Sequence, residues 1–258
     1  MKRIYSLLLA FVLIFNLQTL FAQELKRSPK AHSHNDYEQK RPFDLAIENT
    51  FGSIEADVWL KDNTLCVAHD AKDIQLDRTL ENLYFNKLNT LLQNNKGRPY
   101  KDQRELQLLI DIKSDAKSTL EELIGLLNAY PSIKKSKYIK IVISGNRPVP
   151  AEYTQYPSFI FFDGRPNESY DKKSLKKLGL ISDNYMKYSK WFGNGSISEK
   201  DKSTLKAVIQ KSHDLKKPFR FWATPDNENS WNLFMELGVD YINTDKVAEL
   251  GAFLLNKN

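Results

Sequence analysis

The stretch SIEADVWLKDNTLCVAHD, residues 53–70, contains two short apolar runs that flank a polar turn at residues 61–63. Runs of β-branched and apolar residues that end in polar residues are typical of strands, and so short a turn predicts a hairpin. Successive strand side chains point to opposite faces, so Glu55 and Asp57 share one face of the first run. The apolar side chains of that run share the other face, and the strand must lie between a polar and an apolar environment.

Similar runs recur along the chain, with stretches of helical spacing between them. There are eight, at residues 29–34, 53–59, 106–113, 139–145, 158–164, 180–185, 218–224 and 241–246. Apolar spacings of three and four residues predict helices at 80–93, 114–130 and 198–215, the second with Ser114 or Asp115 as its N-cap. Alternating strands and helices predict a parallel sheet. Eight such units predict an α/β fold, a (β/α)₈ TIM barrel in which residues 64–70 form a hairpin extension after the second strand.

The first 22 residues have the layout of a cleaved secretory signal. Lys2 and Arg3 precede an apolar run that ends at Ala22. An uncleaved anchor is the alternative, but polar residues such as Asn16 interrupt the run short of the roughly 20 residues that a membrane span needs. We expect cleavage near Ala22 and export to the periplasm or the medium. Because no Pro/Gly/Ser-rich linker divides residues 23–258, we expect them to form a single domain.

Charge and cysteine content exclude two broad classes of protein. The chain has a formal net charge of +6 at pH 7, but its basic residues occur in scattered pairs such as Lys134-Lys135 and Lys216-Lys217. A nucleic-acid-binding surface would instead gather them in a stripe interleaved with aromatic residues, so we expect no nucleic-acid partner. Cys66 is the only cysteine, which excludes an internal disulfide framework in an exported chain.

Three acids are expected to converge inside the barrel. Asp111 and Lys113 share a face of the run at 106–113, and the apolar face of each strand must meet the surrounding helices. Glu55, Asp57 and Asp111 then lie near one point, where they either take up protons or are neutralised by a cation. A hard divalent cation with oxygen ligands is the simpler solution. The alternative is that each acid pairs privately with Lys113 or with an arginine.

The histidines of AHSHNDY, residues 31–37, admit more than one interpretation. His32 and His34 share a face of the first strand, with Asn35 beyond its end. Such a pair also begins the barrels of amidohydrolases, which need further histidines on the fifth and sixth strands, and the runs at 158–164 and 180–185 contain none. The other histidines are His69, on the hairpin, and His213, in a helical stretch. A two-histidine metal site therefore lacks its partners.

Together these motifs resemble the phospholipase-C-like phosphodiesterase superfamily. SHNDY resembles the S-H-N-T-Y of phosphatidylinositol-specific phospholipases C, and IEADVWL followed by LCVAHD resembles the E-x-D and H-D motifs that glycerophosphodiester phosphodiesterases and sphingomyelinase D share. LLIDIK matches the third acidic ligand and following lysine of sphingomyelinase D, and FWATPD with ELGVDYINTD is similar to the C-terminal glycerophosphodiesterase pattern. HSHNDY and ISGNRP most resemble the "altered inheritance of mitochondria" branch. The glycerophosphodiesterase arginine after the first histidine is replaced by Asn35, as in phospholipases C, and Pro225 stands where that pattern has asparagine.

The resemblance implies a role for each candidate site residue. His34 and His69 become an acid–base pair, and one divalent cation, Ca²⁺ or Mg²⁺, is bound by Asn35, Glu55, Asp57 and Asp111. The candidate substrate-binding residues are Lys113, Arg147, Arg165, Trp222 and Asp245. Arginine suits phosphate, although both arginines would pair equally well with nearby acids. Two interpretations of His32 stand side by side: a deeper residue that lines the barrel, or a replacement for His34 as the catalyst.

The expected function is that of a metal-dependent phosphoric diester hydrolase. A phosphodiester repels nucleophiles, so a metal and cations must offset its charge while one imidazole removes a proton and another supplies one. We expect a monomer that acts on a phospholipid head group or a glycerophosphodiester, with transient contact to a membrane surface. The alternatives are a non-catalytic barrel that binds a phosphorylated lipid or glycan, and a metal-dependent phosphomonoesterase. The residues leave open which ion is bound, and whether the diester is hydrolysed or cyclised.

Overall fold

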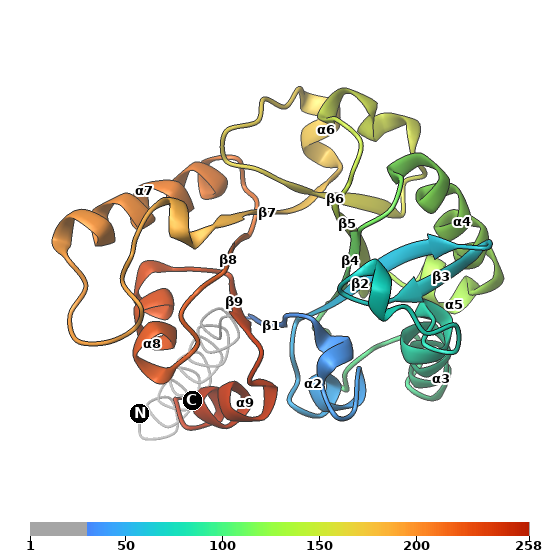
Figure 1. The fold of residues 1–258 in the computed structure, drawn as a ribbon, viewed down its shortest axis with the longest axis horizontal. Helices are drawn as coiled ribbons and strands as arrows, with labels where there is room; N and C mark the ends of the chain where they lie inside the picture. The colour runs from blue at the N-terminus through green and yellow to red at the C-terminus, as the bar shows by residue number, and fades with distance from the viewer. Residues whose placement is uncertain (1–29, 258) are drawn as a thin grey trace, which may run out of the picture.

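The computed structural model of the protein describes residues 30–257. The expected signal segment lies outside the described residues, so its cleavage stays a prediction. Within the described part, nine strands form one sheet in the order β1-β9-β8-β7-β6-β5-β4-β2-β3, and β1 also pairs with β2. That last pairing closes eight parallel strands into a barrel, with the helices outside it (Figure 1). The expected TIM-barrel fold is confirmed.

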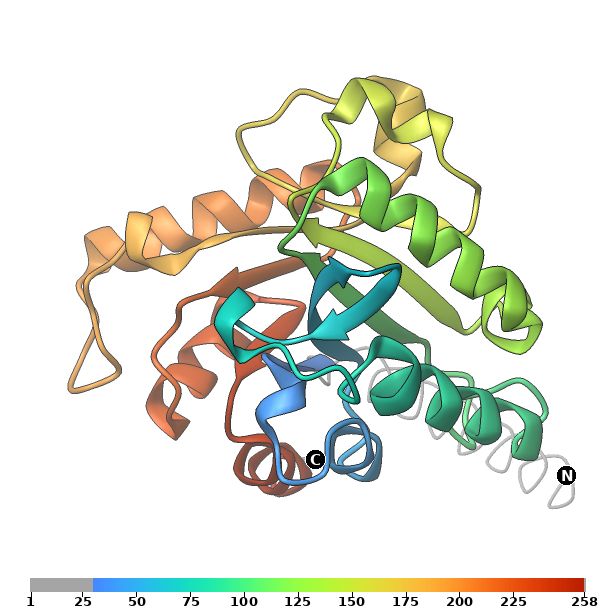
Figure 2. The ribbon, with the colours of Figure 1, turned by 45° about the vertical axis from the view of Figure 1, so that its right-hand side comes forward.

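Each expected strand is present, close to its predicted bounds. The barrel strands are β1 (Lys30–Ser33), β2 (Ser53–Lys61), β4 (Leu106–Ile112), β5 (Ile139–Gly145), β6 (Ile160–Gly164), β7 (Leu178–Asn184), β8 (Phe219–Trp222) and β9 (Tyr241–Thr244). The extra strand β3 (Thr64–Val67) runs antiparallel to β2 and forms the expected hairpin, seen in front of the barrel in Figure 2. Its turn residues Asp62 and Asn63 both have positive φ, as a tight two-residue hairpin turn requires.

Helices cover the outside of the barrel unevenly. The α-helices are α2 (Asp44–Glu48), α3 (Asn86–Asn94), α4 (Ala116–Ala129), α5 (Pro131–Lys135), α6 (Lys172–Lys176), α7 (Glu199–Asp214), α8 (Glu228–Leu237) and α9 (Val247–Leu255). The three predicted helices are confirmed, although the first opens with a π-helical turn, η3 (Glu81–Phe85). Asp115 caps α4 and Ser198 caps α7, since each side chain accepts a hydrogen bond from a backbone N–H in the first turn. Among the described residues, no helix combines the length and apolarity of a membrane span.

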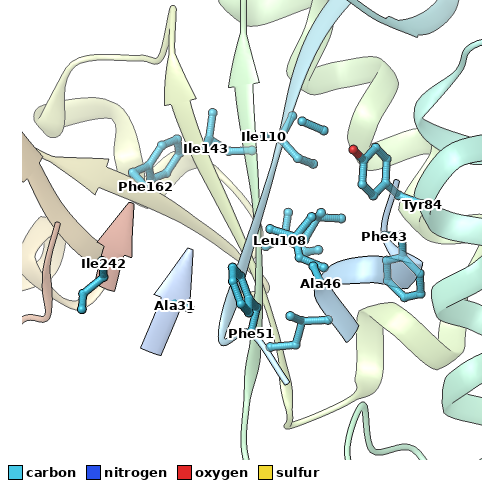
Figure 3. Close-up of a cluster of buried hydrophobic side chains, with 14 of the residues drawn as sticks. Ala31, Phe43, Ala46, Phe51, Tyr84, Leu108, Ile110, Ile143, Phe162 and Ile242 are labelled. Atoms are coloured by element: carbon cyan, nitrogen blue, oxygen red, sulfur yellow. The ribbon is translucent and has the colours of Figure 1, made fainter. Parts of the chain in front are cut away.

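Apolar side chains fill two regions on either side of the sheet. The larger lies between the strands and the helices, where Leu108, Ile110 and Ile143 meet residues such as Phe43 and Phe162 (Figure 3). The smaller is a plug inside the barrel, formed by Leu109, Val142, Leu180 and Tyr241. Two residues further along the same strands stand Asp111, Ser144, Ser182 and Asn243. The inside of the barrel is therefore apolar at one end and polar at the carboxyl ends of its strands, where TIM-barrel sites form.

Candidate active site

A cavity of about 590 Å³ opens at the carboxyl ends of the strands. Eight of the predicted site residues line it: His34, Asn35, Glu55, His69, Asp111, Lys113, Arg165 and Trp222. Asp57 lies fully buried beneath it, whereas Arg147 and Asp245 are not among the lining residues. The predicted site is thus brought together at one place, although three of its eleven members do not line the cavity.

The three acids converge as expected. Asp57 on β2 and Asp111 on β4 are register partners in the parallel ladder, and Glu55 lies two residues before Asp57 on the same face. One carboxylate oxygen from each lies within 4.8 Å of the others. Oxygen atoms this close suit a single hard divalent cation.

The two carboxylate oxygens of Asp57 differ in their contacts. Its Oδ2 accepts hydrogen bonds from the Tyr37 hydroxyl at 2.9 Å and from His69 Nδ1 at 3.1 Å, and Lys113 Nζ lies 3.1 Å away. Its Oδ1 is buried and has no hydrogen-bond partner among the described residues. Burial, followed by the charge of Glu55, raises the pKa of Asp57. A buried, unpartnered carboxylate oxygen is costly, so the donor set fits a bound cation.

The alternative interpretation, in which each acid pairs with a cation of its own, applies only in part to Asp57 and Asp111. Lys113 Nζ also lies 3.1 Å from Asp111 Oδ1, so two acids share one ammonium group. Burial alone would lower the pKa of Lys113, but the charges of Asp111 and Asp57 raise it. Burial, followed by the charge of Glu55, raises the pKa of Asp111 to about 6. One lysine therefore does not relieve the repulsion among the acids.

Two histidines stand at the rim of the cavity, each with a carboxylate on Nδ1. His34 Nδ1 lies 2.8 Å from Asp245 Oδ1, and His69 Nδ1 bonds to Asp57. Burial would lower the pKa of His34, but the hydrogen bond to Asp245 and the charge of Glu55 raise it. The side chains are 29% and 59% exposed, so a ligand can reach the opposite ring nitrogen of each. Asp245, predicted to bind substrate, pairs with His34 and is not among the residues that line the cavity.

His32 lies deeper in the barrel and is fully buried. Its Nδ1 is 2.7 Å from Ser53 Oγ, and its Nε2 is 2.6 Å from Glu55 Oε2. Burial, followed by the charge of Arg220, lowers the pKa of His32 to about 4. With both nitrogens engaged and no face on the cavity, His32 has the position of a lining residue that orients Glu55.

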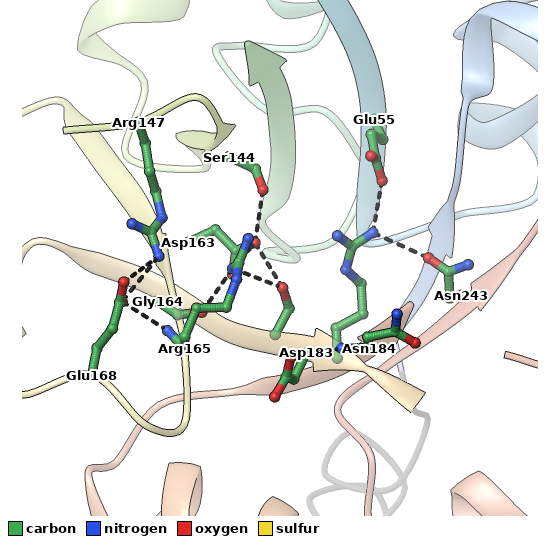
Figure 4. A network of polar contacts seen from close by, with 12 residues as sticks. Glu55, Ser144, Arg147, Asp163, Gly164, Arg165, Glu168, Asp183, Asn184 and Asn243 are labelled. Atoms are coloured by element: carbon green, nitrogen blue, oxygen red, sulfur yellow. Dashed lines mark hydrogen bonds and ion pairs between the residues drawn. The ribbon is translucent and has the colours of Figure 1, made fainter. Parts of the chain in front are cut away.

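The two predicted phosphate-binding arginines have different surroundings (Figure 4). Arg147 Nη2 donates to both carboxylate oxygens of Glu168, at 2.8 and 2.9 Å, away from the cavity. Arg165 lines the cavity, although its Nη1 lies 2.7 Å from Asp163 Oδ2 and also donates to Ser182 Oγ. Arg165 can therefore meet a ligand in this cavity, whereas Arg147 serves the loop that contains Glu168.

Sequence reasoning missed Arg220, on β8. Its Nη1 donates to Glu55 Oε2 at 2.7 Å and to Asn243 Oδ1 at 3.1 Å, and it also meets His32 Nε2 (the first two contacts are drawn in Figure 4). Burial alone would raise the pKa of Glu55, but Arg220 and His32 hold it well below its usual range. A signal was present: Arg220 shares the inward face of its strand with Trp222.

Comparisons with known proteins agree with this fold. Residues 25–149 match the AIM6-like phosphodiesterase domain, and residues 218–248 match the glycerophosphoryl diester phosphodiesterase family. The Altered inheritance of mitochondria protein 6 of Eremothecium gossypii is 28% identical over 269 residues, which cover 87% of this chain and 69% of that protein.

Two solved structures share the fold at low sequence identity. A glycerophosphodiester phosphodiesterase from Parabacteroides distasonis superposes with a TM-score of 0.57 at 17% identity, covering 90% of this chain and 98% of that one. A calcium-dependent phosphoinositol-specific phospholipase C from a Pseudomonas species gives 0.53 at 13% identity, covering 85% and 89%. The predicted resemblance to the phospholipase-C-like phosphodiesterase superfamily is confirmed by the family matches, which cover residues 25–149 and 218–248, and by the relative from Eremothecium gossypii. Within this superfamily, both the matched domain at residues 25–149 and the relative from Eremothecium gossypii are AIM6-like.

Proposed function

We propose that this protein is a metal-dependent phosphoric diester hydrolase. The observation that carries the proposal is the convergence of Glu55, Asp57 and Asp111 within 4.8 Å. Two carboxylate-bound imidazoles stand beside that cluster, at the mouth of the same cavity. An acidic ion site and a pair of proton-transfer groups are the two elements that cleavage of a phosphodiester needs.

The balance of buried charge favours a diester over a monoester. The three carboxylates of the cluster face two fixed cations, Lys113 and Arg220, and Asp163 offsets the charge of Arg165, which leaves one net negative charge. A divalent cation would reverse this to one positive charge. A phosphodiester carries one negative charge and matches it, whereas a phosphomonoester carries about −1.5 to −2 near neutral pH. This count supports the diesterase over the phosphomonoesterase.

One divalent cation, Ca²⁺ or Mg²⁺, would be held by Asn35, Glu55, Asp57 and Asp111. The Asn35 side chain makes no capping hydrogen bond to the helical turn that follows it, and it lines the cavity beside the acids. When bound, the ion would supply positive charge to the phosphate oxygens.

The two histidines would divide the proton transfers between them. One imidazole takes a proton from the attacking water or hydroxyl, and the other gives a proton to the leaving oxygen. Asp245 and Asp57 fix the rings of His34 and His69 through Nδ1, which leaves each Nε2 to exchange the proton. Lys113, Arg165 and Trp222 line the same cavity and would contact the phosphate and the group attached to it.

We propose a phospholipid head group or a glycerophosphodiester as the substrate. The names of the two structural neighbours, a glycerophosphodiester phosphodiesterase and a phosphoinositol-specific phospholipase C, support this class. With residues 1–22 as a secretory signal, the enzyme would act outside the cytoplasm, on free diesters or at a membrane surface.

The test is an assay of the purified 23–258 chain on glycerophosphodiesters and phosphatidylinositol, with and without chelator. Chelation should abolish product formation, and added Ca²⁺ or Mg²⁺ should restore it. His34→Ala and His69→Ala should each lower kcat by about 10²- to 10⁴-fold. His213→Ala is the matched control, because His213 bonds to Asp240 outside the cavity. Turnover that persists in chelator and in the double histidine variant would refute the proposal, and ligand-induced thermal stabilisation without product would indicate a binding protein.

A further inference from the structure

Arg220 is a buried cation with unused hydrogen-bonding capacity. Its side chain is only 3% exposed, yet it lines the cavity that contains His34 and His69. A guanidinium group has five N–H donors. The contacts of Arg220 with Glu55, Asn243 and His32 all use Nη1.

The remaining donors of Arg220 lack acceptors within the described part of the protein. Nε is buried without a hydrogen-bond partner, and no described residue accepts a hydrogen bond from Nη2. Unlike Nε, Nη2 is accessible, and the residue borders the cavity. Unused donors beside a cavity call for an acceptor that a ligand brings, since buried donors are otherwise paired.

Arg220 also lies where its positive charge opposes binding of the proposed cation. Its Nη1 is 2.7 Å from Glu55 Oε2, and Glu55 is one of the three acids of the ion cluster. A fixed positive charge this close repels a second cation and attracts an anion, and it does both strongly in a poorly solvated site. The planar fork of arginine matches the oxygen atoms of a phosphate group.

We propose that Arg220 binds the phosphate in this cavity through its guanidinium group, and that it weakens binding of the divalent cation at the same time. The inference rests on the proposed function, since it takes the cluster to bind a cation and the cavity to bind a phosphodiester. Arg220 should therefore have opposite effects on the affinities for the cation and for the anion. Removing the charge of Arg220 strengthens cation binding and weakens anion binding, whereas loss of a purely structural residue weakens both.

Calorimetric titration of the 23–258 chain tests this inference without any assay of turnover. The probes are Ca²⁺ alone and diethyl phosphate, a stable phosphodiester monoanion, added to the Ca²⁺-loaded protein. In Arg220→Met, the Kd for Ca²⁺ should fall by about tenfold or more, and the Kd for diethyl phosphate should rise by a similar factor. Arg220→Lys keeps the charge, so its Ca²⁺ affinity should stay near that of the wild type while the loss of the fork weakens diethyl phosphate binding.

Controls separate the failure of this inference from the failure of the proposed function. Arg104→Met removes the same charge from an exposed arginine paired with Asp102, outside the cavity, and should change neither Kd. If Arg220→Met does not fold, Arg220→Gln makes the same test, because its amide can still donate to Glu55. Wild-type protein that binds neither probe overturns both proposals. Wild-type protein that binds both, with variants in which both affinities are unchanged or both fall, overturns only the role of Arg220.

Discussion

The two carboxylate oxygens of Asp57 have opposite surroundings. Oδ2 is engaged by Tyr37, His69 and Lys113, whereas Oδ1 is buried and unpartnered among the described residues. The three contacts fix the rotation of the carboxylate, so the open oxygen keeps one direction. If Asp57 binds the proposed cation, this arrangement would hold its open oxygen in place for the ion.

Tyr37→Phe should destabilise the protein by about 1–2 kcal/mol. The substitution removes a buried hydroxyl that donates to an ionised or partly ionised carboxylate, and hydrogen bonds to charged groups are the stronger ones. The control is Tyr153→Phe, because the Tyr153 hydroxyl is buried without a hydrogen-bond partner among the described residues. That variant should be as stable as the wild type, or more so. Urea denaturation measures both, and equal losses would contradict the assignment.

Asp111 should make the chelator-treated protein less stable as the pH rises from about 4 to 6. Its pKa is raised to about 6 by burial and then by Glu55, whereas a free aspartate titrates near 3.9. The folded protein therefore keeps a proton that the unfolded chain has lost, and the free energy of unfolding falls through this window. Asp111→Asn should be more stable than the wild type by roughly 2–3 kcal/mol at pH 7 and equal to it below about pH 4. A difference that does not vary with pH would contradict this.

At the scale of elements, the end of β5 leaves room for the acid on β4. Gly145 has a φ of 68°, and a Cβ added there would lie 2.2 Å from Asp111 Oδ1. The strand therefore needs glycine for its backbone conformation and for the close approach of the carboxylate.

Gly145→Ala should displace Asp111 and weaken Ca²⁺ binding by tenfold or more, an order-of-magnitude expectation for a misplaced ligand. Calorimetric titration measures the change. Gly125→Ala is the control, because Gly125 lies within α4 with no atom within 4 Å of an added Cβ. It should leave the ion affinity unchanged and stabilise the helix by up to about 1 kcal/mol. Unchanged affinity in Gly145→Ala would show that Asp111 does not hold the ion.

Local patterns predicted the elements and the inward faces well, because both depend on neighbours in sequence. Alternation along β2 and β4 places Glu55, Asp57 and Asp111 inside the barrel, as the structure confirms. The same patterns do not say which side chains meet across the barrel. Arg220 was on a predicted inward face, but its contact with Glu55 depends on how β8 lies opposite β2.

The contacts of two loop residues could not be predicted from local patterns either. Asp245 follows β9 and pairs with His34, which follows β1, a contact that the pairing of β1 with β9 creates. Arg147 follows β5 and pairs with Glu168 from the loop beyond β6. Chemistry alone made Arg147 a candidate ligand of a phosphate and Asp245 a candidate ligand of the substrate, but the partners of both side chains depend on the paths of their loops.

At the scale of the whole molecule, closure of the barrel is what creates the site. The apolar plug around Leu109 and Val142 closes one end of the interior, and the polar residues gather at the other. The seam between β8 and β9 has a single register pair, Arg220 with Tyr241. Contacts of Arg220 with Asn243 on β9 and Glu55 on β2 cross this region, so a residue of the site also joins strands of the barrel.

The proposed activity depends on a divalent cation among Glu55, Asp57 and Asp111, and anomalous diffraction from crystals soaked in Mn²⁺ tests that most directly. A single strong anomalous peak should appear between the three side chains, about 2–2.6 Å from an oxygen atom of each. The peak should vanish in crystals of the Asp57→Asn and Asp111→Asn double variant. A well-ordered cavity with no peak at this position, or a peak that persists in the double variant, would contradict the account.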